Sequence, residues 1–578
     1  MQTILLMVAL FAGYLVAYYT YGRFLARRIF KLRRACTVPS EQLRDDIDYV
    51  PTKPIVVFGH HFTSIAGTGP IVGPAIAIIW GWLPAVLWVF FGSIFMGAVH
   101  DFGAMVVSLR NEGKSVAEVA ARYINPRVQV LLFGVVFLEL LIVIAIFGLV
   151  IAALFNMYPA SVFPIWCEIP IALVTGWAIA RRNWNVVVVS IVAVTAMYVT
   201  VGMGHRIPLE MPAIAGVPAT GVWTVILLIY AYVASTLPVT MLLQPRDYIN
   251  AWQLFVAMAL MIVAVVVSGL TADLTMAAPA FQPAPAGAPP LWPMLFVIIA
   301  CGAISGFHSL VASGTSSKQL RSELDAQPVG YGSMLMEGAL AVLVIIAVSA
   351  GVGLSAQSGD TALTGRAAWL HYYGQWTGNS PLDVQLKAFV EGSANMIQHV
   401  GIPHHFALIV MGVFVASFAG TTLDTATRLQ RYVIGELAGR ARAPVLANRW
   451  VATGIAVATA GALAFANGAG GAGAKKLWPL FGSLNQLLAA LALLVVTVYL
   501  RRKGGMKFLV AGLPCLFMLV MTVWAMVLNE LDYVHKSDWL LASLNAVVLV
   551  LAVWMVIEVT ASLARRWGEA PEPEALGR

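Results

Sequence analysis

The chain has 578 residues, of which 60% are hydrophobic and 11% are charged, and its formal net charge is +8. Soluble proteins carry about 25% charged residues, so this composition predicts an all-α integral membrane protein and excludes a soluble globular enzyme. The positive charge does not indicate nucleic acid binding, because most lysines and arginines fall in short loops between apolar runs, where they set topology.

Apolar runs of about 20 residues, the length that crosses a bilayer, predict about 15 transmembrane helices. Numbered one to fifteen, their approximate limits are 2–22, 57–80, 83–109, 129–155, 160–180, 184–203, 220–245, 251–275, 291–315, 333–357, 402–425, 448–466, 475–500, 507–528 and 537–562. The first run lacks a basic start and a cleavage site, so we expect a retained span. Every second loop is basic, beginning with the loop after the first span, and basic loops face the cytoplasm. The loops between them are poor in lysine and arginine, with Lys475-Lys476 as the main exception. This alternation places the N-terminus outside and the C-terminus in the cytoplasm.

The second span contains Phe58-Gly-His-His-Phe-Thr-Ser-Ile-Ala-Gly-Thr-Gly-Pro-Ile-Val-Gly-Pro74. Gly69 and Gly73 are compatible with close helix packing, but Pro70 and Pro74 each remove a backbone donor, which favours a break. A helix breaks inside a membrane only where protein or a wet cavity satisfies its backbone, and transporters bind substrates at such breaks. We therefore expect non-helical backbone around residues 65–69. The candidate substrate-binding residues here are His60, His61, Thr63, Ser64, Gly67, Thr68 and Gly69.

Span seven, with Ser235, Thr236 and Pro238, also carries polar and helix-breaking residues. It lies five spans after span two and, because five is odd, runs in the opposite direction. This arrangement predicts an inverted five-plus-five repeat core of the LeuT type, with broken helices in spans two and seven. Spans two to six form one repeat and spans seven to eleven form the other. Span nine adds the candidate substrate-binding residues Ser305, His308 and Ser309.

The ionisable residues inside spans are candidates for proton coupling, because a charge at that depth is costly. Asp101 in span three and Glu139 in span four are the main carboxylates, and we expect Asp101 to pair with a histidine of span two, such as His61. The alternative for Asp101 is a structural role. Asp424 is expected to pair with Arg428 four residues later.

Three hydroxyl residues at the end of span nine, Ser313, Thr315 and Ser316, form a possible sodium site with carbonyls freed near Ala66. The alternative is that these hydroxyls bond back to their own helix. A metal-ion transporter using the histidines near Asp101 is a further alternative, although adjacent histidines on a helix point about 100° apart. A channel fits the broken helices less well than alternating access does.

The remaining regions carry weaker signals. The four cysteines form neither a disulfide framework nor a zinc pattern. Residues 382–399 are expected to form a surface helix outside the spans, and residues 569–578 a disordered tail. We divide the chain into four regions: 1–56 with the first span and a basic loop, 57–245 and 246–428 with the two parts of the transport core, and 429–578 with additional helices and the tail.

Several long motifs resemble the carbon starvation protein A family. They are Pro54-Ile-Val-Val-Phe-Gly-His-His-Phe-Thr-Ser-Ile-Ala-Gly-Thr-Gly-Pro-Ile-Val-Gly-Pro-Ala75, Gly97-Ala-Val-His-Asp-Phe-Gly103, Gln244-Pro-Arg-Asp-Tyr248, Ser305-Gly-Phe-His-Ser309 with Gly314-Thr-Ser-Ser-Lys-Gln319, and Phe418-Ala-Gly-Thr-Thr-Leu-Asp-Thr-Ala-Thr-Arg428. The resemblance covers roughly residues 40–435 and carries over no residue-level binding motif.

The resemblance implies a secondary active transporter of the bacterial inner membrane, within the amino acid–polyamine–cation superfamily, that imports pyruvate or short peptides when carbon is scarce. It implies coupling to H+, with Na+ as the alternative, and no further cofactor. The implied partners are a small-molecule substrate and membrane lipid. A pyruvate carrier needs a small anion pocket, whereas a peptide carrier needs a larger cavity. A membrane sensor of carbon supply is the alternative outside transport, but no attached signalling domain supports it.

Overall fold

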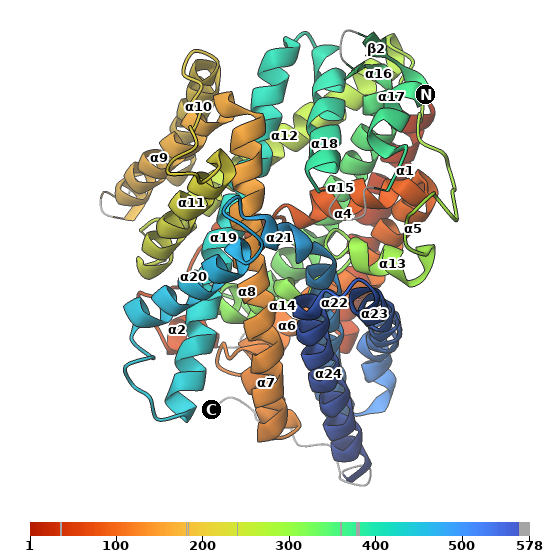
Figure 1. The fold of residues 1–578 in the computed structure, drawn as a ribbon. Helices are drawn as coiled ribbons and strands as arrows, with labels where there is room; N and C mark the ends of the chain where they lie inside the picture. Colours follow the sequence, from red (N-terminus) through yellow and green to blue (C-terminus); the bar gives the residue numbers. More distant parts are fainter. Residues whose placement is uncertain are drawn as a thin grey trace.

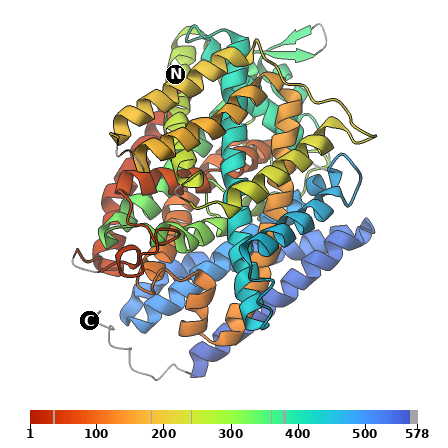
Figure 2. The same ribbon diagram turned by 90° about the vertical axis from the view of Figure 1, so that its left-hand side faces the viewer.

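The computed structural model describes residues 1–34, 37–180, 182, 184–239, 241–358, 361–376 and 382–565. Cys36 and the predicted tail lie outside these residues. In the described part, helices make up the fold apart from one short antiparallel hairpin, β1 (Ala356–Ser358) and β2 (Thr361–Leu363). The long helix α19 (His404–Arg440), in cyan, crosses the molecule from one end to the other in Figure 2.

The helices follow the predicted spans closely in chain order. They are α1 (Gln2–Ala17), α2 (Pro39–Gln42), α3 (Pro54–Ile65), α4 (Gly69–Ala77), α5 (Trp82–Gly92), α6 (Ala98–Leu109), α7 (Val116–Tyr123), α8 (Pro126–Met157), α9 (Val162–Ala180), α10 (Val186–Gly204), α11 (Ala219–Thr236), α12 (Leu243–Thr271), α13 (Leu291–Ile298), α14 (Gly306–Gly314), α15 (Ser333–Ile346), α16 (Val352–Leu354), α17 (Gly365–Tyr373), α18 (Leu382–Gln398), α20 (Arg449–Phe465), α21 (Ala472–Lys476), α22 (Trp478–Arg502), α23 (Leu509–His535) and α24 (Trp539–Arg565). Short π-helical segments lengthen α1 to Ile29 and join α5 to α6.

Twelve helical segments of the described chain are long and apolar enough to cross a membrane, and the bent pair α3–α4 makes a thirteenth. The other two predicted spans correspond to α13 with α14, and to α20, whose helices are each shorter than 18 residues. The protein is therefore a multi-pass membrane protein, and a count above thirteen stays a prediction.

Burial separates a central group of helices from a lipid-facing group. In the span that contains α15, 94% of the most apolar 18-residue stretch is buried, and the value for α22 is 89%. The corresponding value for α10 is 28%, and valines and isoleucines cover its outer face. Figure 1 shows α9 and α10 at the left edge of the molecule, while α4 and α15 lie between other helices.

The predicted break in span two is confirmed. Helix α3 ends at Ile65 and α4 begins at Gly69, with a bend of 43° between the two halves. Gly69 and Pro70 are the first two residues of α4, and Pro70 has no N–H to continue the hydrogen bonds of α3. Helix α3 packs on α12, α15, α19 and α14, and α4 packs on α15, α18 and α13, so protein surrounds the break.

The expected break in span seven is wrong. Helix α11 is continuous to Thr236, and Leu237 leaves it in an extended conformation just before Pro238, because a proline disfavours helical backbone at the residue before it. The chain then enters α12 as a separate helix. The second broken span is span nine, in which residues 299–305 separate α13 from α14. The breaks thus lie in spans two and nine, and the five-plus-five repeat stays a prediction.

The two breaks contact each other. A Cβ added to Gly69 would lie 2.4 Å from Sγ of Cys301, and one added to Gly73 would lie 2.7 Å from the carbonyl oxygen of Ile298. Gly302 has a φ of 84° and lies close to Pro70. Glycine at these positions therefore allows the backbones of the two interrupted spans to approach each other.

One further expectation is corrected by packing. Helix α18 forms as predicted, but it is not a surface helix, because Leu386 and Phe389 are buried and the helix packs on α4 and α19. Among the additional C-terminal helices, α22 packs on α14, α6 and α8.

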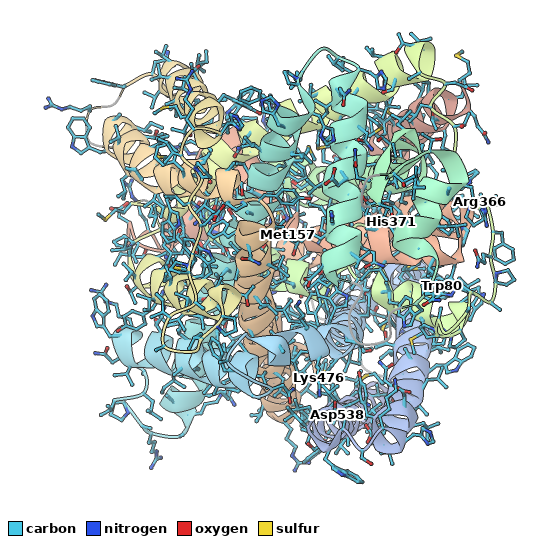
Figure 3. All side chains as sticks on the ribbon, turned by 45° about the horizontal axis from the view of Figure 1, so that its top comes forward. Trp80, Met157, Arg366, His371, Lys476 and Asp538 are labelled. Carbon is cyan, nitrogen blue, oxygen red and sulfur yellow. The ribbon has the colours of Figure 1, made fainter. Side chains whose placement is uncertain are left out.

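The lysines that interrupt the charge pattern are each paired with an acid. Lys475 contacts Asp383, and Lys476 lies 3.5 Å from Asp538, beside which it appears in Figure 3. Both lysines are thus used in ion pairs that join their loop to neighbouring segments.

Candidate functional site

The break in span two is lined by hydroxyl groups without hydrogen-bond partners. The side-chain oxygens of Ser64 and Thr68 are buried and unpaired among the described residues, and so is that of Thr422 on α19. A Cβ added to Gly67 would lie 2.2 Å from Oγ1 of Thr422 and 3.1 Å from the ring of Phe147. Because buried polar groups in native proteins are normally satisfied, these hydroxyls indicate a place where a ligand or water binds.

A cavity of about 600 Å³ lies between α8, α11, α14 and α19 at their basic ends. We call it the basic cavity, and four cations line it: Lys318, Arg428, Arg431 and Arg449. Its inner wall is apolar and includes Leu140 and Leu310.

The cations of the basic cavity are held in place by neighbouring groups. Arg428 pairs with Asp48 at 2.8 Å, and Lys318 lies 5.2 Å and 5.4 Å from the ring centres of Tyr49 and Tyr432. Burial lowers the pKa of Lys318 despite the nearby negative charge of Asp48. The cavity mouth thus combines fixed positive charge with a lysine that loses its proton more readily than usual.

The basic cavity and the break lie along the same faces of two helices. On α19, Thr422 contacts the break, Thr425 has an unpaired buried hydroxyl, and Leu429 lines the cavity. On α8, Phe147 contacts the break and Leu140 lines the cavity. A spacing of seven residues corresponds to about 10 Å along a helix. About two helical turns of packed side chains therefore separate the cavity from the break.

The two histidines of α3 bind different partners. Nδ1 of His60 lies 2.6 Å from a carboxylate oxygen of Asp247 on α12, and Nδ1 of His61 lies 2.9 Å from the hydroxyl of Ser316. Neither Nε2 has a partner within the described residues. The expectation that Asp101 pairs with a histidine of span two is therefore wrong.

Asp101 is at the centre of a buried histidine–carboxylate cluster. One carboxylate oxygen lies 2.7 Å from Nδ1 of His100, and the other lies 2.9 Å from Nδ1 of His308. Nε2 of His308 lies 3.4 Å from Glu337 on α15, whose other oxygen accepts a hydrogen bond from the N–H of Gly302. The cluster therefore links α6, the second break and α15 in the interior of the protein.

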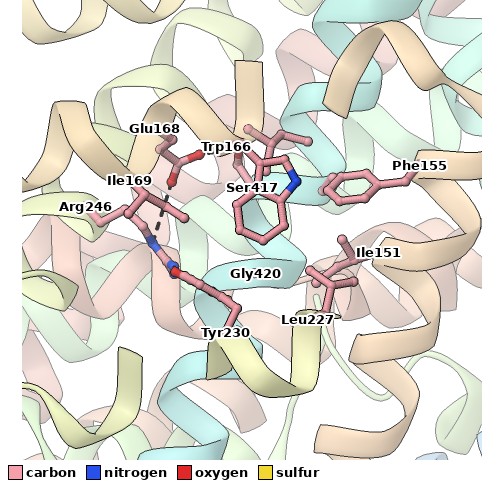
Figure 4. Close-up of a pocket in the computed structure, with 12 residues that line it drawn as sticks. Ile151, Phe155, Trp166, Glu168, Ile169, Leu227, Tyr230, Arg246, Ser417 and Gly420 are labelled. Atoms are coloured by element: carbon pink, nitrogen blue, oxygen red, sulfur yellow. Dashed lines mark hydrogen bonds and ion pairs between the residues drawn. The ribbon is translucent and has the colours of Figure 1, made fainter. Parts of the chain in front are cut away.

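A second buried group of charges surrounds Arg246 at the start of α12, and Figure 4 shows part of it. Arg246 contacts Asp424 and the hydroxyl of Tyr230, and its Nε lies 3.5 Å from Glu168. Asn250 donates a hydrogen bond of 2.6 Å to Glu168. The adjoining pocket measures about 30 Å³, which is room for a water molecule rather than a substrate.

The partner predicted for Asp424 is wrong, because Arg246 replaces Arg428. Asp424 and Arg428 are one helical turn apart, but Arg428 reaches Asp48 and Tyr432 instead. Packing of α12 against α19 decides the partner here, since it brings Arg246 to the buried side of Asp424.

Several predicted site residues bond to their own helix. Ser235, Thr236, Ser309 and Ser313 donate to carbonyls three or four residues earlier, and so does Thr63. Ser305 bonds to Asn485 of α22. Thr236 and Ser313 line the basic cavity, whereas Thr315 does not. Both oxygens of Glu139 are buried and unpaired among the described residues.

The hydroxyls of the predicted sodium site have partners in the protein. Ser313 donates to the carbonyl of Ser309, and the hydroxyl of Ser316 lies 2.9 Å from Nδ1 of His61. These contacts are compatible with the alternative in which the hydroxyls serve the local structure, and the sodium site stays a prediction.

Sequence reasoning missed four groups that complete the polar interior: Arg246, Asp247, Glu337 and Asn485. Glu337 sits alone in an apolar run, and an isolated intramembrane acid is a functional candidate by default. Arg246 and Asp247 belong to the motif Gln244-Pro-Arg-Asp-Tyr248, which resembles the family pattern, but no role in the site is predicted for its charged residues. Asn485 accepts from the N–H of Phe307 at the start of α14, a contact between distant parts of the chain.

The sequence matches the family described as Carbon starvation protein CstA over residues 2–367 and 377–525. Among curated proteins it is similar to the pyruvate/proton symporter BtsT of Escherichia coli, with 32% identity over 90% of this chain and 81% of the relative. It is also similar to the peptide transporter CstA of Campylobacter jejuni, with 31% identity over 92% and 81%. The peptide transporter CstA of Bacillus subtilis is 29% identical over 98% of both chains.

Two solved structures of transporters align with the fold at a TM-score of 0.48. One is MhsT in complex with L-phenylalanine, with 12% identity over 82% of this chain and 99% of the other. The other is a manganese transporter of Eremococcus coleocola, with 13% identity over 90% and 99%.

Proposed function

We propose a transport function from the premise that this chain belongs to the carbon starvation protein CstA family. The protein imports a small carbon source, pyruvate or a short peptide, across the bacterial inner membrane by secondary active transport. Its relatives carry the names of a pyruvate/proton symporter and of peptide transporters, which supports this class of substrate. The N-terminus lies outside and the C-terminus lies in the cytoplasm, as the basic loops favour.

The observation that carries the proposal is the row of buried, unpaired hydroxyls between the break and the basic cavity. Thr68, Thr422 and Thr425 have no hydrogen-bond partner among the described residues, although each is buried. An unpaired buried hydroxyl costs about 1–3 kcal/mol, so a passing polar substrate that pairs with these groups recovers that cost. The substrate site is therefore the break of span two, and the basic cavity is its cytoplasmic exit.

The chemistry of this path suits a carboxylate, which pyruvate and peptides share. Helix α4 starts at the break with the N-cap residue Thr68, whose side chain makes no capping hydrogen bond. The positive end of the helix dipole favours a carboxylate there. Lys318 and Arg431 at the cavity can pair with an anion, and three acids, Asp48, Glu118 and Glu436, line the same cavity. A peptide also needs a partner for its amine, for which Asp48 and Glu436 at the cavity are candidates.

Coupling is assigned to H+, with Asp101 as the carboxylate that carries the proton. Its neighbour His100 can accept or return a proton, and no lysine or arginine of the described chain pairs with it. His61 and Glu139 are further candidates, since Nε2 of His61 and both oxygens of Glu139 are unpaired. Sodium at Ser313, Thr315 and Ser316 is the alternative.

Counterflow uptake in proteoliposomes tests the substrate site without any ion gradient. Vesicles preloaded with unlabelled pyruvate or dipeptide exchange it for the labelled compound. We expect exchange of one of the two compounds, and a loss of at least tenfold in Thr68→Val, because valine keeps the shape and removes the hydroxyl.

The matched control is Thr459→Val on the exposed face of α20, whose hydroxyl bonds back to Ile455. Equal exchange by Thr68→Val, Thr459→Val and the wild type contradicts a substrate site at the break. No exchange of either compound by the wild type contradicts the transport function itself.

A further inference from the structure

Three potential metal ligands meet at the second break, which contacts the first break where Cys301 lies against Gly69. They are Cys301 in the break itself, His308 on α14 and Glu337 on α15, and they are 7%, 0% and 0% exposed. One donor atom of each residue lies within 4.8 Å of the others. No other such group of three appears among the described residues.

The separation of two of these atoms, on His308 and Glu337, fits a metal ion with tetrahedral geometry. Nε2 of His308 and Oε2 of Glu337 are 3.4 Å apart, which is long for a hydrogen bond. Zinc binds nitrogen and oxygen at about 2.0–2.2 Å, and two ligands of a tetrahedron with such bonds are about 3.4 Å apart. The observed separation therefore equals the edge of a zinc coordination shell.

The same atoms lack other partners in the protein. Nε2 of His308 and Oε2 of Glu337 are buried and make no hydrogen bond to a described residue. Two unpaired polar atoms that face each other across 3.4 Å point to a group between them.

The surroundings orient each ligand as metal sites require. Nδ1 of His308 lies 2.9 Å from Asp101, which is the carboxylate–histidine arrangement found behind metal-bound imidazoles. The N–H of Gly302 donates to the other oxygen of Glu337 and fixes the carboxylate. The amide of Asn485 lies 3.8 Å from Sγ of Cys301, so it can donate to a thiolate.

The charge balance favours a cation as well. Glu337 and Asp101 are both buried, and only histidines lie beside them, since no lysine or arginine of the described residues forms an ion pair with either. A buried carboxylate is costly in the interior of a membrane protein, and these histidines neutralise it only when they are protonated. A divalent ion compensates this charge directly.

We infer that Cys301, His308 and Glu337 form a site for a divalent transition-metal ion of the zinc type, which fastens the second break to α15. Thiolate, imidazole and carboxylate together select zinc or cobalt over magnesium and calcium, which prefer oxygen ligands only. Three protein ligands leave one position for water. The site does not depend on the identity of the transported substrate.

Metal analysis of the full-length, tag-free protein tests the site. Protein produced in zinc-supplemented medium is purified and dialysed, and zinc is measured by mass spectrometry. We expect one zinc per chain in the wild type and at least a tenfold lower content in Glu337→Gln, which keeps the size of the side chain. Wild-type protein without zinc overturns the inference.

Cobalt supplies a readout that folding defects alone do not mimic. Cobalt-loaded wild type should show the thiolate-to-metal absorption band in the near ultraviolet, and Cys301→Ser should lose it. The matched control is Cys515→Ser on α23, a buried cysteine far from the cluster in sequence, which should keep the band. Asp101→Asn should weaken cobalt binding about 10–100-fold by removing the support of His308. A band that persists in Cys301→Ser, or that disappears equally in Cys515→Ser, overturns the assignment.

Discussion

Substitution of Gly67 by alanine tests the packing that forms the break in span two. The added Cβ would lie 2.2 Å from Oγ1 of Thr422, whereas real contacts of this kind essentially never fall below 3.0 Å. The helices must therefore separate locally or Thr422 must change rotamer. Overpacking of this size costs about 1–3 kcal/mol, which lowers the ratio of folded to unfolded protein about 5-fold to 160-fold.

A second substitution isolates the contact. Thr422→Ala removes Oγ1 and leaves its Cβ at 3.1 Å from the new methyl group, a tight contact that small shifts relieve. We expect Gly67→Ala to cost less than about 1 kcal/mol in this background, so that the two substitutions are coupled by about 1–2 kcal/mol. The unfolding free energy is measured in mixed micelles titrated with sodium dodecyl sulfate.

The control for helix propensity is Gly202→Ala. Gly202 lies in α10, is exposed and has no heavy atom within 4 Å of the added Cβ, so alanine should stabilise the protein by about 0.5–1 kcal/mol. The reasoning is refuted if Gly67→Ala behaves like Gly202→Ala, or if its cost is the same with and without Thr422.

Three further predictions concern charged groups. Asp424→Asn should destabilise the protein by about 3–5 kcal/mol, because Arg246 keeps a buried charge without its main partner. In the dodecyl sulfate titration, the double variant with Arg246→Gln should recover part of this lost unfolding free energy. Asp101→Asn should abolish pH-driven accumulation of substrate while substrate exchange continues. Unchanged accumulation in the vesicle assay would mean that a residue other than Asp101 carries the coupling proton. Burial raises the pKa of Asp48, but the charge of Arg428 and its hydrogen bonds outweigh this and hold the pKa below the usual 3.8. The stability from this contact is thus complete above the unfolded pKa and is lost as pH falls through the lower folded value. The difference in unfolding free energy between wild type and Asp48→Asn should stay constant from about pH 7 to pH 5. It should begin to fall near pH 3.8 and disappear below the lower folded pKa. A difference that grows on acidification would contradict the assignment.

Local signals in the sequence were sufficient for the helices and for the first break. Pro70 has no N–H to donate, and Gly67 and Gly69 have low helix propensity, so the interruption after Ile65 follows from the residues themselves. Pro238 gives the same local signal but falls between two helices. A proline that ends a helix and one that breaks a span differ only in whether the chain continues in the same direction, which is a tertiary property.

The partners of the polar residues could not be predicted in the same way. His60 is separated from Asp247 by 187 positions and Asp101 from His308 by 207, so packing of distant helices decides each pair. The sequence identified Asp101 and His308 as unusual for their depth, because burial cost depends on the single residue. It did not identify Glu337 as the third member, since nothing local connects an isolated acid to a histidine 29 positions earlier.

Uptake of labelled pyruvate and dipeptide into proteoliposomes under an imposed pH gradient tests the central claim most directly. The medium contains choline in place of sodium, and the outside is more acidic than the lumen. We predict accumulation of one of these compounds above its external concentration, with collapse when a protonophore removes the gradient. Equilibration without accumulation, or accumulation only when sodium is restored, would contradict proton-coupled import.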